Sequence, residues 1–270
     1  GINPMLFFSL NDAERKTIGV PEIDKRILTR ENGWLIEALA THYEYCGSQQ
    51  SLTMAINATD WINQYCRLTS GAYITNVMAD KTIHLADTLS MARALLQLYR
   101  TTFDTRYLEK AAESADYIDK HFKHEICGYN SRIKNEYDQT PPRQMDENIA
   151  LARFANLLSY YTNENRFKNI AKHGLRYLCI PEIATARMEE AGILLIDYEI
   201  LTTPLTITIY GDQTSKLAKE FKHIAFKHPG WYKLIKLCQS KLTYASIQID
   251  GFESRPITTT KKLIELLHNH

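Results

Sequence analysis

The sequence predicts a mainly helical protein of stacked antiparallel helical hairpins followed by a small α/β unit. Two observations support this fold class. A two-helix pattern recurs three times along most of the chain, and a run of β-branched residues that alternates with a period of two appears only after residue 203. We therefore expect one helical domain over residues 1–203 and a small α/β unit over residues 204–270, packed on that domain.

The repeated pattern is an amphipathic segment, a short polar turn and a second amphipathic segment. The first segments end near Tyr43, Tyr99 and Tyr161, and the turns that follow read Cys-Gly-Ser, Thr-Phe-Asp and Asn-Glu-Asn. Apolar residues recur at three- and four-residue intervals, as at Leu85 and Leu89, which is the spacing of one helix face. A single hairpin cannot bury its apolar face, so the recurrence predicts hairpins that stack side by side, with the repeated aromatic residues in their core.

The connectors between the hairpins are much longer than the turns within them and run over residues 67–83 and 123–147. Because the helices of a hairpin are antiparallel, the short turns share one end of the stack and the long connectors share the other. Long loops on a rigid helical frame often carry function. The first helix of each pair also begins at this end, with unpaired N–H groups and the positive end of its dipole. We expect the functional site there.

The pattern changes after Cys179. Residues 189–201 are predicted to form a helix whose apolar face contains Ile193, Leu194, Ile196 and Leu201. The alternation in residues 205–210 predicts a strand. A helix over 215–226, short strands over 233–238 and 245–249, and a last helix over 260–268 complete the unit. The order of strand, helix and strand predicts a small sheet appended to the helical body.

Composition argues against several classes of protein. The apolar content of 44% and charged content of 23% are ordinary for a globular protein, and a net charge of +1 gives no electrostatic reason to bind nucleic acid or an anionic membrane. No apolar run reaches the roughly 20 residues that span a bilayer. The five cysteines are odd in number, widely spaced and without a CxxC, which predicts reduced thiols and a cytoplasmic location.

Several segments resemble the motifs of a known family, in the same order along the chain. Residues 24–29 with the Asn-Gly at 32–33 resemble its DDKILTxWNG motif, and residues 94–99 resemble its ALLxLY helix. Residues 204–211 resemble PxEVVIVG, and residues 256–258 resemble the closing PVT. On these residues the chain resembles the C-terminal region of the spermatogenesis-associated thioredoxin-like proteins. Their (α/α) toroid is similar to N-acylglucosamine 2-epimerases and six-hairpin glycosidases.

The resemblance implies a partial (α/α) toroid, because fewer hairpins are visible than the six of a closed ring. It also implies a carbohydrate or a similar polar metabolite as ligand. Redox chemistry is not implied, since the family's thioredoxin-like domain and its CxxC have no counterpart in these residues. Glu31 stands where the family has an aromatic residue and Thr88 where it has tyrosine, and Gln248 and Glu253 replace a cysteine pair.

Polar residues gather where the connectors meet the predicted helix starts. Asp87, Asp138 and Glu147 are the candidate catalytic residues, because two carboxyl groups that face each other across a depression can act as general acid and base on a glycosidic bond. The favoured pair is Asp87 with either Asp138 or Glu147. The candidate substrate-binding residues are Glu31, Asn32, His84, Tyr137 and Asn148.

These residues also have a structural interpretation. Asp and Asn at helix starts are common N-caps, each of which stabilises a helix by about 1 kcal/mol. His84 has no partner at metal-ligand spacing, and no phosphate-binding glycine motif is present, so neither a metal nor a cofactor is predicted. The favoured function is therefore carbohydrate or polar-metabolite binding, with hydrolysis or epimerisation as the expected reaction. The alternative is a non-catalytic module whose open half-ring docks a thioredoxin-like chain or a second copy of itself.

Overall fold

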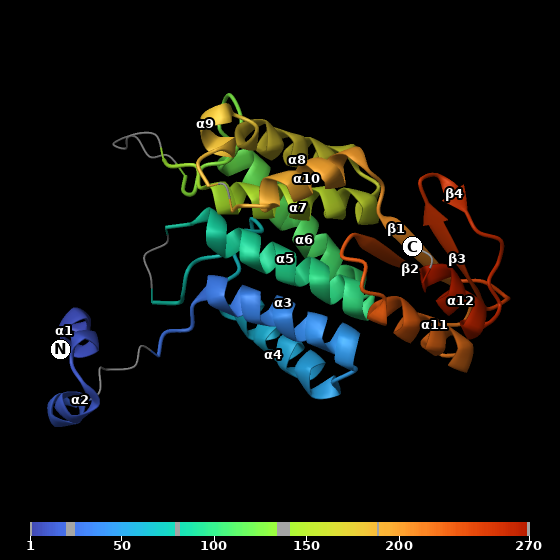
Figure 1. Cartoon of the computed structure of the whole chain (residues 1–270), viewed down its shortest axis with the longest axis horizontal. Coiled ribbons are helices and arrows are strands. Elements are labelled where there is room, and N and C mark those ends of the chain that lie inside the picture. Colours follow the sequence, from blue (N-terminus) through green and yellow to red (C-terminus); the bar gives the residue numbers. More distant parts are fainter. Residues whose placement is uncertain (1, 20–24, 79–81, 134–140, 188, 269–270) are drawn as a thin grey trace.

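Helical hairpins form the body of the chain in the computed structural model, which describes residues 2–19, 25–78, 82–133, 141–187 and 189–268. Helix α5 packs against α3, α6 and α7, and Figure 1 shows α3, α5 and α7 running in one direction across the body. The predicted stack of hairpins is confirmed and has the architecture of a partial (α/α) toroid. The paired helices are α3 (Thr29–Cys46) with α4 (Gln49–Tyr65), α5 (Leu85–Thr102) with α6 (Thr105–His121), and α7 (Met145–Thr162) with α8 (Asn165–Leu178).

The same backbone conformation closes each hairpin. The residue after the first helix is left-handed each time, with φ of 72° at Gly47, 62° at Phe103 and 57° at Asn163. The N–H groups of Gly47 and Phe103 donate to the carbonyls of Tyr43 at 2.8 Å and Tyr99 at 2.6 Å. These bonds satisfy carbonyls that a helix C-terminus otherwise leaves unpaired. The repeated tyrosine therefore belongs to the last turn of the first helix.

The repeated tyrosines also pack in the core, as predicted. The rings of Tyr99 and Tyr161 lie 5.3 Å apart and edge to face, so they join the second hairpin to the third. Tyr43 and Phe103 both contact Phe226 of the C-terminal unit, with centroids 6.4 and 6.3 Å from its ring. Aromatic pairs of this kind add about 0.5–1.5 kcal/mol beyond the area they bury. The turn end of the body is therefore tied to the C-terminal unit.

Gly33 marks a close crossing of α3 and α5. A Cβ atom at this position would lie 2.8 Å from the backbone carbon of Ser90. Because that backbone cannot move cheaply, we expect Gly33→Ala to lower the free energy of unfolding by about 1–3 kcal/mol in urea denaturation. Gln50→Ala on the exposed side of α4 is the control and should stay within about 0.5 kcal/mol of wild type. Equal stability of Gly33→Ala and wild type would contradict the close crossing.

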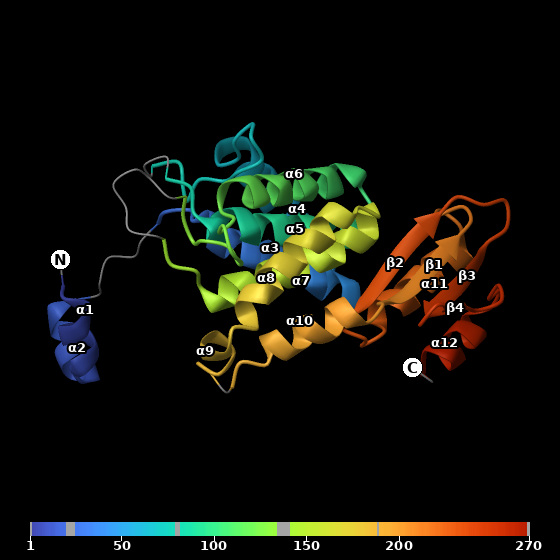
Figure 2. The same cartoon turned by 90° about the horizontal axis from the view of Figure 1, so that it is seen from above.

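The long connectors contain matching short hairpins. Each has an antiparallel bridge, which involves Tyr73 in the first connector and Tyr129 in the second. The hydroxyl of Tyr73 donates to Asn63 and that of Tyr129 to Asp119, both at 2.6 Å. The structural repeat thus includes the connectors. Figures 1 and 2 place their described parts at the end where α3, α5 and α7 begin, opposite the C-terminal unit, as predicted.

Two further helices lie on the third hairpin. They are α9 (Pro181–Ala184) and α10 (Gly192–Leu201), and α10 packs against α7 and α8. The predicted apolar face of α10 is partly wrong. Ile193 and Ile196 are buried, but Leu194 and Leu201 are 74% and 76% exposed. The buried face of α10 includes Glu199 instead. This carboxylate pairs with Arg153 of α7, and the pair fixes the rotation of α10 about its own axis.

The C-terminal unit is a four-stranded sheet with two helices. The sequence predicts three of the strands and both helices in this order, but not the short strand Phe252–Glu253. Strand order is β2-β1-β3-β4, with β1 parallel to β2 and antiparallel to β3. Gln248 pairs directly with Glu253, so the positions where the similar family has cysteines face each other. The division at residues 203 and 204 remains a prediction. The elements are β1 (Leu205–Tyr210), α11 (Lys216–Lys227), β2 (Lys233–Cys238), β3 (Tyr244–Ile249), β4 (Phe252–Glu253) and α12 (Thr260–His268).

Two short N-terminal helices, α1 (Pro4–Ser9) and α2 (Asp12–Ile18), were not predicted. Figures 1 and 2 show them beyond the connector end, apart from the body. Among the described residues, none of the helices has the length and apolar character needed to cross a membrane. All five cysteines are free thiols.

Candidate functional site

A cavity of about 320 Å³ lies where α3, α5 and α7 begin. We call it the helix-start cavity. Four of the eight residues proposed for the site from the sequence line it, although they come from distant parts of the chain. The structure therefore brings the predicted helix starts together. Its lining residues are Leu28, Arg30, Glu31, Thr75, His84, Ala86, Asp87, Ser131, Gln144 and Glu147.

Asp87 is a buried carboxylate in the first turn of α5, only 3% exposed. The hydroxyl of Thr75 donates to its Oδ2 at 2.7 Å, and the charge of Arg30, at the start of α3, also acts on the carboxylate. Burial raises the pKa of Asp87 above its ordinary value of 3.8, although the Thr75 hydrogen bond and the nearby His84 and Arg30 oppose the shift. Asp87 therefore joins α5 to the first connector at Thr75, whose carbonyl accepts a hydrogen bond from the N–H of Thr29 at the start of α3.

Glu147 belongs to the first turn of α7 and approaches the same cavity. Burial raises its pKa above the ordinary value of 4.5, and the nearby charge of Asp146 raises it further. The Ser131 hydroxyl, Arg30 and His84 oppose this shift. Its Oε2 atom is enclosed, and the described residues offer it no hydrogen-bond partner of good geometry. An enclosed carboxyl oxygen without a partner is costly unless water or a ligand binds it.

Arg30 is the cation that the two carboxyl groups share. Its guanidinium pairs with Glu31 at 2.8 Å, which is the main cause of its raised pKa, and the charges of Asp87 and Glu147 both add to the shift. The influence is reciprocal, since the Arg30 charge lowers the pKa of both carboxyl groups. One residue from each of α3, α5 and α7 thus takes part in a single electrostatic cluster.

The other candidates from the sequence lie elsewhere or outside the described residues. The Asn32 amide donates to the Leu28 carbonyl at 2.8 Å and so completes the first turn of α3. Asn148 is fully buried, and its amide bonds to the backbone of Tyr129 and Gln144. Both asparagines therefore hold the frame and are absent from the lining of the cavity. Tyr137 and Asp138 lie outside the described residues.

The structure also adds residues that the sequence reading missed. Arg30 directly precedes Glu31 in the first turn of α3. Its place at a predicted helix start could therefore have identified it as a site residue. Thr75 and Ser131 come from the connectors, where no periodic pattern says which side chain points inward. Their contribution becomes visible only because the connector hairpins fold back over the helix starts.

The pKa shift of Glu147 predicts a measurable effect on stability. A raised pKa means that the folded state holds the proton more tightly than the unfolded state, so the unfolding free energy falls as pH rises through the interval between the two values. We expect Glu147→Gln to unfold at a higher temperature than wild type at pH 7.5, with the difference shrinking toward pH 4.5. Glu182→Gln on exposed α9 is the control. A Glu147→Gln protein less stable than wild type at every pH would contradict the burial of the charge.

The described residues contain no group of three or more His, Cys, Asp or Glu side chains that could hold a metal ion. The helix-start cavity presents the two carboxyl groups with raised pKa, the carboxyl group of Glu31, an imidazole and a guanidinium. Such groups can donate and accept protons and can hydrogen-bond hydroxyl groups.

Comparison with known families shows a match to the helical body of the chain. The profile of the β-L-arabinofuranosidase GH127 catalytic domain matches residues 31–173, more than half of the chain. This segment contains most of α3, all of α4 to α7, most of α8 and eight of the ten residues that line the helix-start cavity. Curated protein sequences offer no match.

Several solved structures with a similar fold are carbohydrate-active proteins. An α-1,6-mannanase of Salegentibacter sp. is 14% identical, with 76% of this chain and 58% of that chain covered and a TM-score of 0.53. A sugar epimerase from a ruminal bacterium is 18% identical, with 58% and 45% covered and a TM-score of 0.50. A family 76 glycoside hydrolase of Bacteroides thetaiotaomicron is 16% identical, with 55% and 34% covered and a TM-score of 0.50. The chain thus spans about a third to three fifths of these proteins, and the likeness shows the fold.

Proposed function

Because the chain belongs to the family of the β-L-arabinofuranosidase GH127 catalytic domain, we propose that it acts on a carbohydrate in the helix-start cavity, as a hydrolase or an isomerase. The observation that carries this proposal is the convergence of Asp87 and Glu147 in one cavity, both with a raised pKa. Carboxyl groups whose pKa is raised toward the working pH are suited to proton transfer.

Each group in the cavity has a role in this proposal. Asp87 is held in place by the Thr75 hydroxyl, so it is the first candidate for the proton-transferring residue. Glu147 is the second, and its enclosed, unpartnered Oε2 would accept a hydrogen bond from a sugar hydroxyl or a water molecule when the side chain turns toward the cavity. Arg30 and His84 would bind hydroxyl groups of the sugar. Asp138 remains a prediction as the partner of Asp87.

Product analysis tests this proposal. We expect the purified chain to release sugar from, or to isomerise, at least one member of a panel of arabinofuranosides, mannosides and free aldoses, as followed by chromatography. At least one member should also raise the unfolding temperature of the protein. A panel that gives neither turnover nor a thermal shift would overturn the proposal.

Exposed apolar residues on the first hairpin favour a second candidate function. Trp34 and Leu35 of α3 are each 51% exposed, and Met54 of α4 is 49% exposed. A non-catalytic module would use this flank to dock a thioredoxin-like chain or a second copy. Light scattering after size-exclusion chromatography separates the two functions: a dimer that dissociates on Trp34→Glu substitution favours the module, and an active monomer favours the enzyme.

The finer resemblance to the spermatogenesis-associated family and the cytoplasmic location remain predictions.

A further inference from the structure

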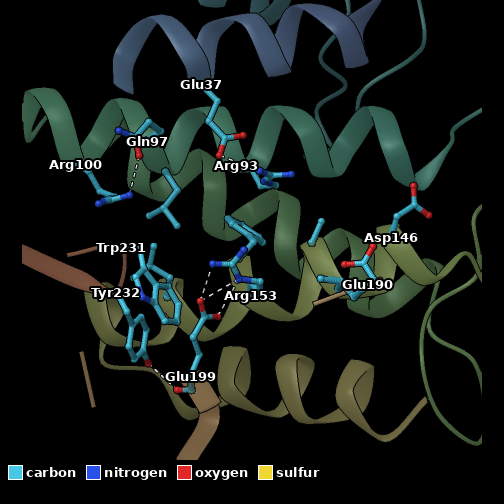
Figure 3. Close-up of a pocket in the computed structure, with 15 residues that line it drawn as sticks. Glu37, Arg93, Gln97, Arg100, Asp146, Arg153, Glu190, Glu199, Trp231 and Tyr232 are labelled. Atoms are coloured by element: carbon cyan, nitrogen blue, oxygen red, sulfur yellow. Dashed lines mark hydrogen bonds and ion pairs between the residues drawn. The ribbon is translucent and has the colours of Figure 1, made fainter. Parts of the chain in front are cut away.

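A second cavity lies at the junction between the helical body and the C-terminal unit. It has a volume of about 310 Å³ and is bounded by α5, α7, α10 and the residues that precede β2. We call it the junction pocket. Figure 3 shows its charged and aromatic side chains converging from these elements. None of its lining residues lines the helix-start cavity.

Ion pairs occupy the walls of the junction pocket. Arg93 of α5 pairs with Glu37 of α3 at 3.0 Å. Arg153 of α7 binds Glu199 of α10 through two nitrogens, with Nε and Nη2 at 2.9 and 2.7 Å from Oε1. The lining holds three arginines against four carboxylates, so the pocket is close to neutral. This balance disfavours a strongly charged ligand and presents donors and acceptors side by side, which suits vicinal hydroxyl groups.

Gln97 supplies the observation that points to a ligand. It is 95% buried on the wall of the pocket, since only 5% of the residue is exposed. Its Oε1 accepts a hydrogen bond from Arg100 at 2.8 Å, whereas its buried Nε2 has no partner among the described residues. Leaving a buried donor unpaired costs about 1–3 kcal/mol. Because this nitrogen is enclosed, a ligand oxygen removes the cost only when the Gln97 amide rotates and turns Nε2 into the pocket.

Trp231 provides an apolar face beside these polar groups. Its side chain is 52% exposed although it lines the pocket, and the guanidinium of Arg153 lies 5.7 Å from its ring centroid. The ring of Tyr232 stacks 5.7 Å away, and its hydroxyl donates to the backbone carbonyl of Glu199 at 2.7 Å, which fixes this segment against α10. A rigid aromatic face next to paired hydrogen-bonding groups matches the C–H and O–H faces of a sugar ring.

We propose that the junction pocket is a second binding site, which takes a neutral polyhydroxylated ligand of one or two sugar rings. Gln97 and the two ion pairs bind its hydroxyl groups, and Trp231 covers one of its faces. The site shares its ligand class with the proposed function, but it is separate from the helix-start cavity and does not require catalysis.

Tryptophan fluorescence and calorimetry can test this site. The chain has three tryptophans, and Trp34 is a matched control for Trp231. It is also half exposed and has an arginine over its ring, with the Arg30 guanidinium 5.1 Å from the ring centroid. It lies outside the junction pocket. We titrate wild type, Trp231→Ala and Trp34→Ala with mannose, arabinose, mannobiose and cellobiose. We expect at least one sugar to bind wild type and Trp34→Ala equally, and Trp231→Ala to bind it at least about tenfold more weakly.

Gln97→Met provides the second variant. The substitution keeps the volume of the side chain and removes the unpaired amide, so we expect an unfolding temperature within about 4 °C of wild type together with about tenfold weaker binding. Asp60→Asn, on the exposed side of α4, should bind the sugar as wild type does. Failure of all four sugars to bind wild type, or equal weakening by Trp34→Ala and Trp231→Ala, would overturn the proposal, whatever the activity assays give.

Discussion

Asp87→Asn is expected to lower kcat/KM on the sugar that the chain converts by about 10²–10⁴-fold, because the amide can neither donate nor accept the transferred proton in the manner of a carboxyl group. The fold should persist, since the amide oxygen can still accept the Thr75 hydroxyl. The measurement is a comparison of initial rates for wild type and variant, with a thermal melt to show that both are folded.

The matched control for this prediction is Asp60→Asn, which alters an exposed aspartate of α4. We expect its kcat/KM to equal that of wild type. If Asp87→Asn retains full activity, or if the two variants lose activity equally, then Asp87 has no part in the reaction and the proposed function loses its leading residue.

The second large effect concerns the stability of the junction between α7 and α10. Arg153→Met is expected to lower the free energy of unfolding by about 3–5 kcal/mol, because it leaves a buried carboxylate without its partner. The side chain of Glu199 is only 5% exposed in this pair. Urea denaturation at pH 7 gives the value directly.

Arg93→Met is the control for Arg153, because it breaks an ion pair of similar length on the same pocket. The side chains of Arg93 and Glu37 are 34% and 29% exposed, so this pair should contribute only about 0–1 kcal/mol. The double substitution of Arg153→Met and Glu199→Gln should recover part of the loss, since it removes the buried charge. An Arg153→Met protein as stable as Arg93→Met would show that Glu199 is hydrated and that the junction is looser than described.

The helices and their connection could be predicted because their signals are local. Apolar spacing, the turn at Gly47 and the tyrosines before each turn all act within a few residues, and they are repeated. The strand at residues 205–210 was predictable for the same reason, since alternation of β-branched residues reflects a strand whose two faces differ. The shared end of the long connectors followed from the antiparallel pairing of the helices, and it brought Asp87 and Glu147 together.

Long-range contacts account for what could not be predicted. The rotation of α10 depends on Glu199 finding Arg153, which lies 46 residues earlier, and no pattern within the helix indicates it. The junction pocket depends in the same way on Trp231 approaching α7. Asn148 was proposed as a substrate contact because of its place at a helix start, whereas its amide holds the connector backbone at Tyr129. A helix start identifies candidate residues but does not say which way each side chain points.

The central claim is that the starts of α3, α5 and α7 form one electrostatic cluster, and NMR titration of side-chain carboxyl carbons tests it most directly. In wild type, Asp87 and Glu147 should both titrate above their ordinary pKa values. Arg30→Met should raise both pKa values further, because one cation lowers both, while Arg106→Met at an exposed site should move neither. If Arg30→Met shifts only one carboxyl group or neither, the three helix starts do not share a cavity.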